Sequence, residues 1–269
     1  MTPKLRIKFI TNWIKDYAKK NKIKTLVVGV SGGIDSAVVS TLCARTGIQT
    51  FAVCMPIKQS KHTHKLSTEH ALWLTTKYDN AVNFTVDLTP TFKQFEKVTG
   101  GVFDNELAYA NSRSRLRMMT LYQIAQSNSG IVVGTGNKVE DFGVGFFTKY
   151  GDGGVDISPI ADCLKTEVWD MGRELGIMQE IIDAAPTDGL WDDHRTDEDQ
   201  LGMSYQDLER MMALDFLKRC KIIDSDMPGS SKLSADDRKK LKRYQDLRAR
   251  NLHKMQPIPI CIIPKQDKE

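Results

Sequence analysis

The sequence lacks the patterns that mark several large classes of protein. It has no Cys-x-x-Cys pair, which argues against a zinc ribbon, a redox dithiol and a disulfide framework. No run approaches the roughly 20 apolar residues of a membrane span, and charges interrupt the N-terminal stretch where a signal peptide would be apolar. We therefore expect a cytosolic protein. Because free cysteines are often buried, we expect single buried thiols at Cys43, Cys54, Cys163, Cys220 and Cys261.

A strong charge of one sign is also missing. The 38 basic and 34 acidic residues leave a net charge of +4, too mild to indicate a nucleic-acid partner. The length of 269 residues, with 41% hydrophobic and 27% charged residues, fits one globular domain, which we expect to span residues 1–269. The segments 186–203 and 224–237 are rich in acidic or turn-forming residues. They are interpreted either as mobile segments that close over a ligand or as plain solvated connections.

Short apolar runs alternate with longer amphipathic ones along the chain. This alternation predicts an α/β fold, a doubly wound and mostly parallel sheet with helices on both faces. Strands are predicted over residues 24–30, 49–55, 81–88 and 130–135. Helices are predicted over residues 4–20, 35–45, 63–78, 105–127, 165–175 and 204–219.

The first predicted strand ends in the turn "SGGIDS", residues 31–36. In open parallel sheets, ligands bind beyond the carboxyl ends of the strands, where helix N-termini favour anions. Glycines let the backbone approach a phosphate closely, the serines add hydroxyl donors, and Asp35 can hold a magnesium ion. The turn therefore predicts a phosphate site with a metal ligand. A serine and glycine turn that only caps a helix is the alternative.

This turn is neither a Walker A loop nor a dinucleotide fingerprint, because the spacing of both motifs is absent. "SGGIDS" instead resembles the pyrophosphate loop of the N-type ATP pyrophosphatases. Those enzymes split ATP into AMP and pyrophosphate to adenylate a substrate, and the loop alone does not identify the substrate.

A second informative segment covers residues 132–168. The strand before it ends at Thr135, which places the following loop at the same sheet edge as Ser31. Glu140 lies just beyond and could complete a magnesium shell with Asp35, although a solvated surface charge is the alternative for an isolated glutamate. The stretch "FFTKYGDGGVD" then combines aromatic rings, a lysine and two aspartates, which suit an aromatic, phosphorylated ligand.

This segment closely resembles ammonia-dependent NAD synthetase, and the resemblance extends over most of the chain. It rests on "SGGIDS", "NSRSRLR" (111–117), "GTGNKVE" (134–140), "FFTKYGDGG", Lys165, "PT" (186–187) and "LHK" (252–254). The family implies an adenine nucleotide alpha hydrolase-like fold and an ATP- and Mg²⁺-dependent ligase. Such a ligase amidates nicotinic acid adenine dinucleotide (deamido-NAD) to NAD through an acyl adenylate, releasing AMP and pyrophosphate.

The resemblance also implies roles for individual residues. Asp35 and Lys165 are expected to be catalytic, and Asp35 and Glu140 to hold magnesium. The expected ATP ligands are Ser31, Gly32, Gly33, Asp35, Ser36, Thr135, Lys165 and Thr187. The expected deamido-NAD ligands are Arg115, Lys149, Asp156, His253 and Lys254. Family members are homodimers, so a homodimer is expected here. Because the phosphate loop starts only 30 residues into the chain, free ammonia or a separate partner is expected to supply the nitrogen.

The chain departs from the family pattern at two places. One extra residue lies between Glu140 and "TKYGDGG", and the family's Pro-Thr-Ala-Asp-Leu is replaced by "PTDGL" at 186–190. Both differences bear on the expected contacts of Glu140 and Thr187.

On the helix at 105–127, Asn111 and Arg115 share one face, whereas Arg113 and Arg117 share another. Only one pair can easily face a single ligand, and a solvated basic helix is the alternative, above all for Arg113. The histidines His62, His64 and His70 fit no familiar zinc spacing, so no metal is expected there.

Two other functions remain open from the residues. A tRNA-modifying or purine-amidating ATP pyrophosphatase would share the phosphate loop, although paired cysteines or a stronger basic face would be expected of some of these enzymes. A nucleotide-binding regulatory module without catalysis would tolerate the loss of Asp35.

Overall fold

The computed structural model describes residues 1–59, 61–187, 196–220 and 233–263. Its centre is a parallel sheet with strand order β3-β2-β1-β4. The strands are β1 (Thr25–Gly29), β2 (Gln49–Cys54), β3 (Ala81–Thr85) and β4 (Gly130–Val132). This confirms the α/β prediction, and each strand lies inside the range expected from the sequence.

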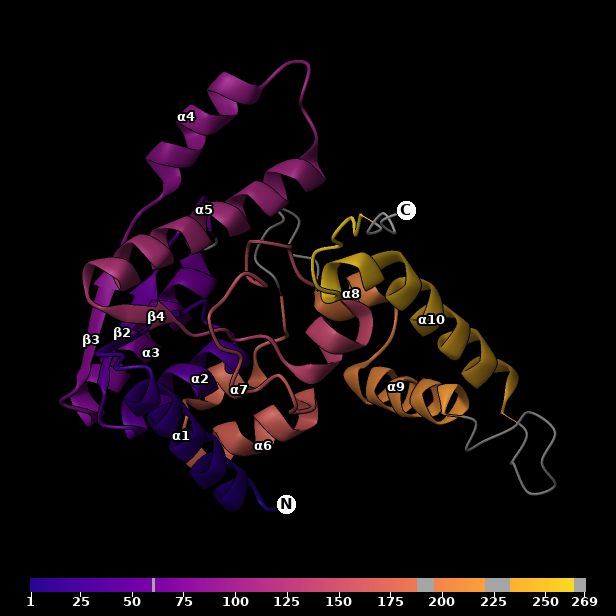
Figure 1. Ribbon diagram of the computed structural model, residues 1–269, viewed down its shortest axis with the longest axis horizontal. Helices are drawn as coiled ribbons and strands as arrows, with labels where there is room; N and C mark the ends of the chain where they lie inside the picture. The colour runs from indigo at the N-terminus through magenta and orange to yellow at the C-terminus, as the bar shows by residue number, and fades with distance from the viewer. Residues whose placement is uncertain (60, 188–195, 221–232, 264–269) are drawn as a thin grey trace, which may run out of the picture.

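Helices cover both faces of the sheet (Figure 1). Side chains of β1 alternate between the two faces: Leu26 and Val28 enter one core, and Val27 enters the other. The first core is covered by α1 (Pro3–Lys20), α2 (Ile34–Arg45) and α6 (Lys165–Leu175), with α3 (Lys61–Lys77) beside α2. The second core is covered by α4 (Thr89–Thr99) and α5 (Glu106–Ser127). The carboxyl ends of the strands are thus the accessible edge of a sheet buried on both faces.

A separate helical lobe lies beside the sheet (Figure 1). It packs the π-helix η1 (Lys138–Val144) against α9 (Tyr205–Arg219) and α10 (Ala235–Met255), with α8 (Asp197–Leu201) nearby. Its apolar core includes Val139, Leu208, Met211 and Tyr244. The short helix α7 (Gln179–Asp183) follows α6 and packs on the sheet side. Because η1 follows β4 in the chain and packs in the lobe, it connects the sheet to the lobe.

Every helix predicted from the sequence is present with ends within two residues of the expected ones. The helices α4 and α10 were not predicted. Only Phe92 is buried in α4, where Phe95 and Val98 are exposed, and Leu241, Tyr244 and Leu247 are the buried residues of the highly charged α10, so neither helix buries the wide apolar stripe of a core helix. Part of the expected mobile segment 186–203 forms α8, whereas residues 188–195 and 224–232 lie outside the described residues.

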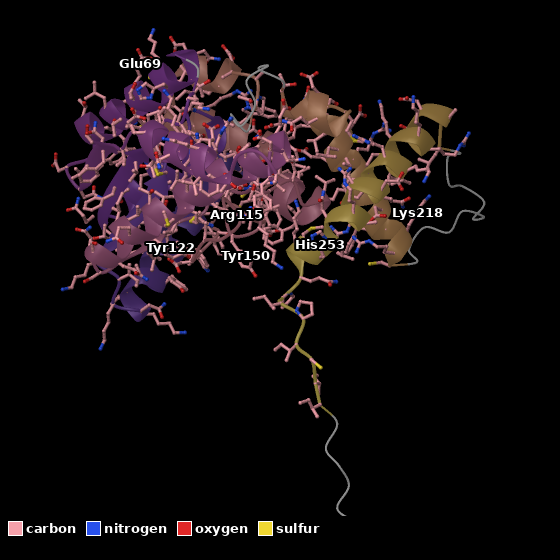
Figure 2. The ribbon with its side chains drawn as sticks, turned by 90° about the horizontal axis from the view of Figure 1, so that it is seen from above. Glu69, Arg115, Tyr122, Tyr150, Lys218 and His253 are labelled. Atoms are coloured by element: carbon pink, nitrogen blue, oxygen red, sulfur yellow. The ribbon has the colours of Figure 1, made fainter. Side chains whose placement is uncertain are left out.

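The cysteine prediction is correct for three residues and wrong for two. Cys43, Cys54 and Cys163 are buried, but Cys220 at the end of α9 and Cys261 in the C-terminal tail are exposed. The tail, residues 256–263, runs outward from α10 (Figure 2) and exposes Ile258, Ile260, Ile262 and Ile263. Within the part of the chain that the structure describes, no helix is long and apolar enough to cross a membrane.

Candidate active site

The turn between β1 and α2 is built around a glycine that no other residue can replace without strain. Gly32 has φ +91°, and a Cβ atom there would lie 2.7 Å from the carbonyl oxygen of Thr63. Ser36 Oγ donates to Gly33 O at 3.0 Å and accepts from the backbone N–H of Ser31 at 3.1 Å. The serines thus fix the turn at the N-terminus of α2, where Gly33 provides no side-chain cap. An uncapped helix N-terminus favours an anion.

Lys165 lies at the bottom of the crevice beside this turn, with 2% of its side chain exposed. It is the first residue of α6, and its Nζ donates to Asp35 Oδ2 at 2.6 Å and to Glu140 Oε1 at 2.9 Å. Asn137, which is fully buried, donates from Nδ2 to Asp35 Oδ1 at 3.3 Å. One ammonium group therefore connects the first strand–helix turn with the residues that follow β4.

Burial and charge act in opposite directions on this cluster. Burial alone would lower the pKa of Lys165, but the carboxylates of Asp35 and Glu140 outweigh it and raise that pKa. Burial raises the pKa of Asp35, against the opposing effect of the Lys165 ammonium. Asp141, the neighbour of Glu140, has a pKa raised well above its usual value by burial and by the nearby carboxylates of Asp152, Glu140 and Asp35. The crevice thus concentrates negative charge around one cation.

Glu140 lies in the π-helix η1, whose start is fixed by a side-chain cap. A π-helix closes each backbone hydrogen bond over one more residue than an α-helix does. The side chain of Asn137 caps η1 by accepting from the backbone N–H groups of Val139 and Glu140, each at 3.1 Å. Glu140 lies in the first turn and reaches Lys165, which also contacts Asp35.

All the residues expected to bind ATP line one crevice. They are Ser31, Gly32, Gly33, Asp35, Ser36, Thr135, Lys165 and Thr187. The sequence analysis missed other residues that line the same crevice: Gln59, Asp141, Asp152 and Asp197. Spacing alone does not identify these residues, because they come from loops and helices far apart in the chain.

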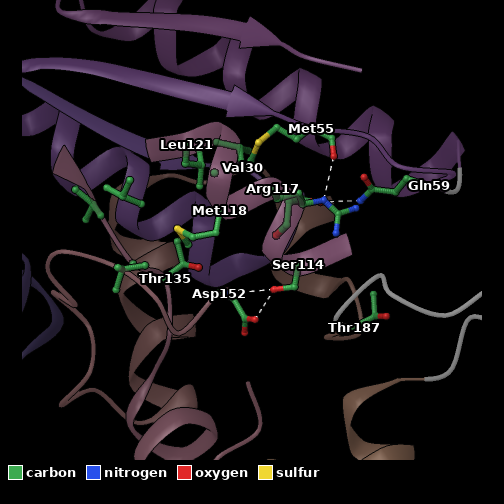
Figure 3. A pocket seen from close by; sticks show the side chains of 16 residues that line it. Val30, Met55, Gln59, Ser114, Arg117, Met118, Leu121, Thr135, Asp152 and Thr187 are labelled. Atoms are coloured by element: carbon green, nitrogen blue, oxygen red, sulfur yellow. Dashed lines mark hydrogen bonds between the residues drawn. The ribbon is translucent and has the colours of Figure 1, made fainter. Parts of the chain in front are cut away.

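An apolar pocket adjoins the crevice and shares Ser31, Thr135 and Thr187 with it (Figure 3). Its walls include Val30, Met55, Met118, Leu121 and Val155. Arg117 lines the pocket as well, and its Nε donates to the carbonyl oxygen of Met55 at 3.0 Å. A pocket with apolar walls and few polar groups suits a flat aromatic ring. It could hold the base of a nucleotide whose phosphates lie over Gly32 and Gly33.

The arginines of α5 separate as the helix geometry predicts. Arg117 faces the apolar pocket, whereas Arg115 is exposed and donates from Nε to the carbonyl oxygen of Lys149 at 3.2 Å. The alternative of a solvated basic residue is wrong for Arg113, which is 9% exposed and lies over the ring of Phe92. A cation packed on an aromatic ring is stabilised in the core.

Most of the residues expected to bind deamido-NAD lie on an outer face near the end of α10. Figure 2 shows Arg115, Tyr150 and His253 along this face. Lys149 Nζ contacts the carbonyl oxygen of His253 at 3.5 Å, and Lys254 Nζ donates to the carbonyl oxygen of Phe147 at 2.7 Å. These cations donate hydrogen bonds to backbone carbonyl groups, which carry no net charge. A negatively charged ligand can therefore still bind to them.

Asp156 has a different position from the other residues of that set. Its Oδ2 accepts from the backbone N–H of Val132 at 2.7 Å, and its Oδ1 accepts from the hydroxyl group of Tyr122 at 3.2 Å. Asp156 therefore also links the loop that contains it to the end of β4.

Of the three histidines considered for a metal site, His70 lies in the protein core. His70 is buried, with Nε2 2.9 Å from Ser40 Oγ, and burial lowers its pKa to about 4. Among the described residues, no cluster of three or more His, Cys, Asp or Glu suits a metal ion. Asp35 and Glu140 nevertheless fit the donor set of magnesium, which usually takes one or two carboxylates together with phosphates and water.

Comparisons with known proteins give matches over most of the chain. Residues 6–258 match the model of a family described as NAD synthase. The NH(3)-dependent NAD(+) synthetase of Mesoplasma florum is 41% identical over 208 residues, which cover 76% of this chain and 82% of that protein. The NH(3)-dependent NAD(+) synthetase of Archaeoglobus fulgidus is 32% identical over 254 residues, covering 94% of each chain.

A solved structure is similar over nearly the whole chain. The NMN synthetase from Francisella tularensis superposes with a TM-score of 0.80 at 32% identity, covering 98% of this chain and 99% of that one. The fold described above is therefore also the fold of an NMN synthetase.

Proposed function

The chain belongs to the NAD synthase family, and from this premise we propose that it is an ammonia-dependent NAD synthetase. It is an ATP-dependent ligase that amidates deamido-NAD to NAD, the final step of NAD biosynthesis, and releases AMP and pyrophosphate. The observation that carries the proposal is the contact of Lys165 with both Asp35 and Glu140 beside the Gly32–Gly33 turn. This arrangement combines a cation, two metal-binding carboxylates and an anion-binding turn.

The reaction follows from the charge of the substrate. The nicotinate carboxylate is a poor electrophile, so an oxygen of it first attacks the α-phosphorus of ATP. The bond to the bridging oxygen breaks, pyrophosphate leaves, and an acyl adenylate forms. Ammonia then attacks the acyl carbonyl carbon, loses a proton, and expels AMP to leave the amide. No protein nucleophile is required, so positioning and electrostatic stabilisation dominate the catalysis.

Residues of the crevice have separate roles in this scheme. The Gly32–Gly33 turn and the N-terminus of α2 hold the phosphates, and Lys165 stabilises the charge that develops on pyrophosphate. The apolar pocket beside Met118 and Leu121 holds the adenine ring. Thr135 and Thr187, which line both cavities, contact the nucleotide between its base and its phosphates.

Asp35 and Glu140 are the proposed magnesium ligands. When bound, Mg²⁺ would neutralise phosphate charge and orient the leaving group. Lys165 contacts one oxygen atom of each carboxylate in the structure. When the metal binds, each carboxylate must therefore either keep this contact with Lys165 while it also binds the metal, or lose the contact.

The proposed site for the nicotinate nucleotide is the outer face with Arg115, Lys149, His253 and Lys254, together with Asp156. The exposed Arg115 and the half-buried Lys149 and Lys254 suit the phosphates of a nucleotide. A shorter substrate, nicotinic acid mononucleotide, is the second candidate. The match to an NMN synthetase over 98% of this chain favours it, at the same 32% identity as the Archaeoglobus NAD synthetase.

We propose a homodimer as the assembly. A row of apolar side chains is exposed along α4, the following loop and the start of α5: Phe95, Val98, Val102, Phe103 and Leu107. An apolar patch of this kind marks an interface, and a second copy can cover it by twofold symmetry. Light scattering at micromolar concentration should give twice the chain mass of 30.3 kDa. A mass of one chain would contradict the proposal.

The cytosolic location expected from the sequence stays a prediction.

One assay tests the reaction and its substrate. The protein is supplied with ATP, Mg²⁺, ammonium and either deamido-NAD or nicotinic acid mononucleotide, and the amide, AMP and pyrophosphate are measured. Equal yields of the three products support the ligase, and the larger kcat/KM identifies the substrate. Formation of ADP, or release of pyrophosphate without amide, would contradict it. The tRNA-modifying, purine-amidating and regulatory alternatives predict no amide from either nucleotide.

A further inference from the structure

We propose that Tyr205 is a positioning residue for Glu140: its hydroxyl group holds one carboxylate oxygen of Glu140 so that the other faces the crevice. The inference rests on the proposed function, because it explains how a carboxylate that is proposed to bind the metal is oriented. Tyr205 was not singled out from the sequence, and it does not line the crevice itself.

The contact is specific to one oxygen atom. Tyr205 is 1% exposed, and its hydroxyl group donates to Glu140 Oε1. The same Oε1 accepts from Lys165 Nζ at 2.9 Å. Across the residues that the structure describes, no hydrogen bond reaches Glu140 Oε2. Two donors thus occupy one oxygen, and the second oxygen is left for a ligand of the crevice, which Glu140 lines.

Tyr205 is held by two contacts of its ring and one of its backbone. The ring of Trp169 packs edge-on against it at 5.7 Å between centroids, and Lys165 Nζ lies 4.9 Å from its centre. Trp169 and Lys165 are four residues apart on α6 and therefore share a face. The backbone N–H of Tyr205 donates to Glu198 Oε1 at 2.9 Å. These contacts leave the ring little freedom, so the position of the hydroxyl group is fixed by the packing of α6 against α9.

The hydroxyl group acts as a donor toward its neighbours. Glu140 Oε1 and Asp197 Oδ2, the latter 3.4 Å away, are both carboxylate oxygens, which accept hydrogen bonds. A hydroxyl group that faces two acceptors is suited to orienting a carboxylate.

A matched pair of variants tests the role. Tyr205→Phe removes the hydroxyl group and keeps the ring. Tyr244→Phe is the control, because Tyr244 is also fully buried in the helical lobe and donates to the carbonyl oxygen of Gly143 in η1, not to Glu140. Partners that orient metal ligands typically change metal affinity by 10- to 100-fold when removed. We therefore expect Tyr205→Phe to weaken Mn²⁺ binding to the ATP-loaded protein by about 10-fold or more, measured from the free-Mn²⁺ signal in electron paramagnetic resonance. Tyr244→Phe should stay within about twofold, since it removes a contact of similar burial without touching the ligand.

A double-mutant cycle separates positioning from general stability. In a Glu140→Gln background, Tyr205→Phe should have no further effect on Mn²⁺ affinity, because the carboxylate through which it acts is gone. Additive effects would overturn the inference, as would wild-type Mn²⁺ affinity in Tyr205→Phe. If Tyr205→Phe fails to fold by circular dichroism, p-aminophenylalanine at position 205 restores a donor and should keep Mn²⁺ affinity near that of the wild type. Loss of affinity in that folded variant would also overturn it.

The same data distinguish this inference from the proposed function. If Asp35→Asn weakens Mn²⁺ binding and Tyr205→Phe does not, the metal site stands and the positioning role is wrong. If the wild-type protein forms no amide in the assay above, the proposed function is wrong whatever Tyr205 does.

Discussion

The crevice and the outer face hold their charged side chains in opposite ways. In the crevice, Lys165 is buried and bonds directly to two carboxylates. On the outer face, Arg115 and Lys149 are more accessible, and they donate hydrogen bonds to backbone carbonyl groups. The cation of the crevice is thus paired with carboxylates before any ligand arrives, whereas the outer face carries positive charge that a ligand can neutralise.

This difference separates residues that affect both stability and catalysis from residues that mainly affect ligand affinity. A buried ion cluster contributes to the folded structure as well as to chemistry, because removing one partner leaves an uncompensated charge. Exposed cations contribute little to stability and mainly affect ligand affinity. Substitutions in the two regions should therefore separate activity, stability and substrate affinity.

The largest effect is expected at Asp35. Asp35→Ala removes both a partner of Lys165 and a proposed metal ligand, and turnover should fall by at least about 1000-fold. Formation of the amide, AMP and pyrophosphate is measured, with circular dichroism to confirm that the fold is intact. An active variant would remove Asp35 from the metal site and would weaken the contrast between the two regions.

Lys165→Met should destabilise the protein itself. Methionine keeps an unbranched side chain one atom shorter than lysine but leaves Asp35 and Glu140 buried without a cation, which typically costs about 3–5 kcal/mol. Urea unfolding at pH 7.5 measures the loss, with Lys149→Met as the outer-face control, where a change under about 0.5 kcal/mol is expected. Lowering the pH toward 5 should restore part of the loss, because burial raises the pKa of Asp35 and protonation removes its charge. Equal losses in the two variants would contradict the comparison.

A buried polar contact outside both regions should have an intermediate effect. Burial lowers the pKa of His70 to about 4, so this residue is neutral in the folded protein, whereas the unfolded chain binds a proton below about pH 6.5. The free energy of unfolding should therefore fall by about 2 kcal/mol from this group between pH 7 and pH 5. His70→Gln, compared with the wild type over this range, should show a shallower decline. Parallel curves would show that His70 does not titrate as its burial implies.

The smallest free-energy change is expected on the outer face. Arg115→Ala should raise KM for the nicotinate nucleotide by about 10-fold, since one charge-assisted contact is lost, and should leave KM for ATP unchanged. Its stability should change by less than about 0.5 kcal/mol. Arg173→Ala is the control, because Arg173 is an exposed arginine that pairs with Asp170 within α6. A parallel rise in KM for ATP would mean that the two regions are not separate.

The sequence was sufficient for the sheet, the phosphate turn and most helices, since these depend on local periodicity and on glycine chemistry. Alternation along β1 and the apolar residues of α2 are visible without a structure. Tyr205 was not predictable, because it lies 65 residues from Glu140 and a tyrosine at the start of a helix looks like any core residue. Arg113 was misjudged for a related reason: the ring of Phe92 that covers it belongs to α4, a helix that was not predicted and that buries only this one residue.

The C-terminal tail has a property that its exposed isoleucines alone would not suggest. Successive backbone N–H groups of an extended chain point to opposite sides, and proline has none, so Pro257 and Pro259 remove two donors from the same side. Ile258, Ile260 and Ile262 keep theirs on the other side. Another strand can therefore pair with the tail along only one of its two edges. An ordered aggregate that grows by pairing of further strands cannot grow at the edge that carries the prolines.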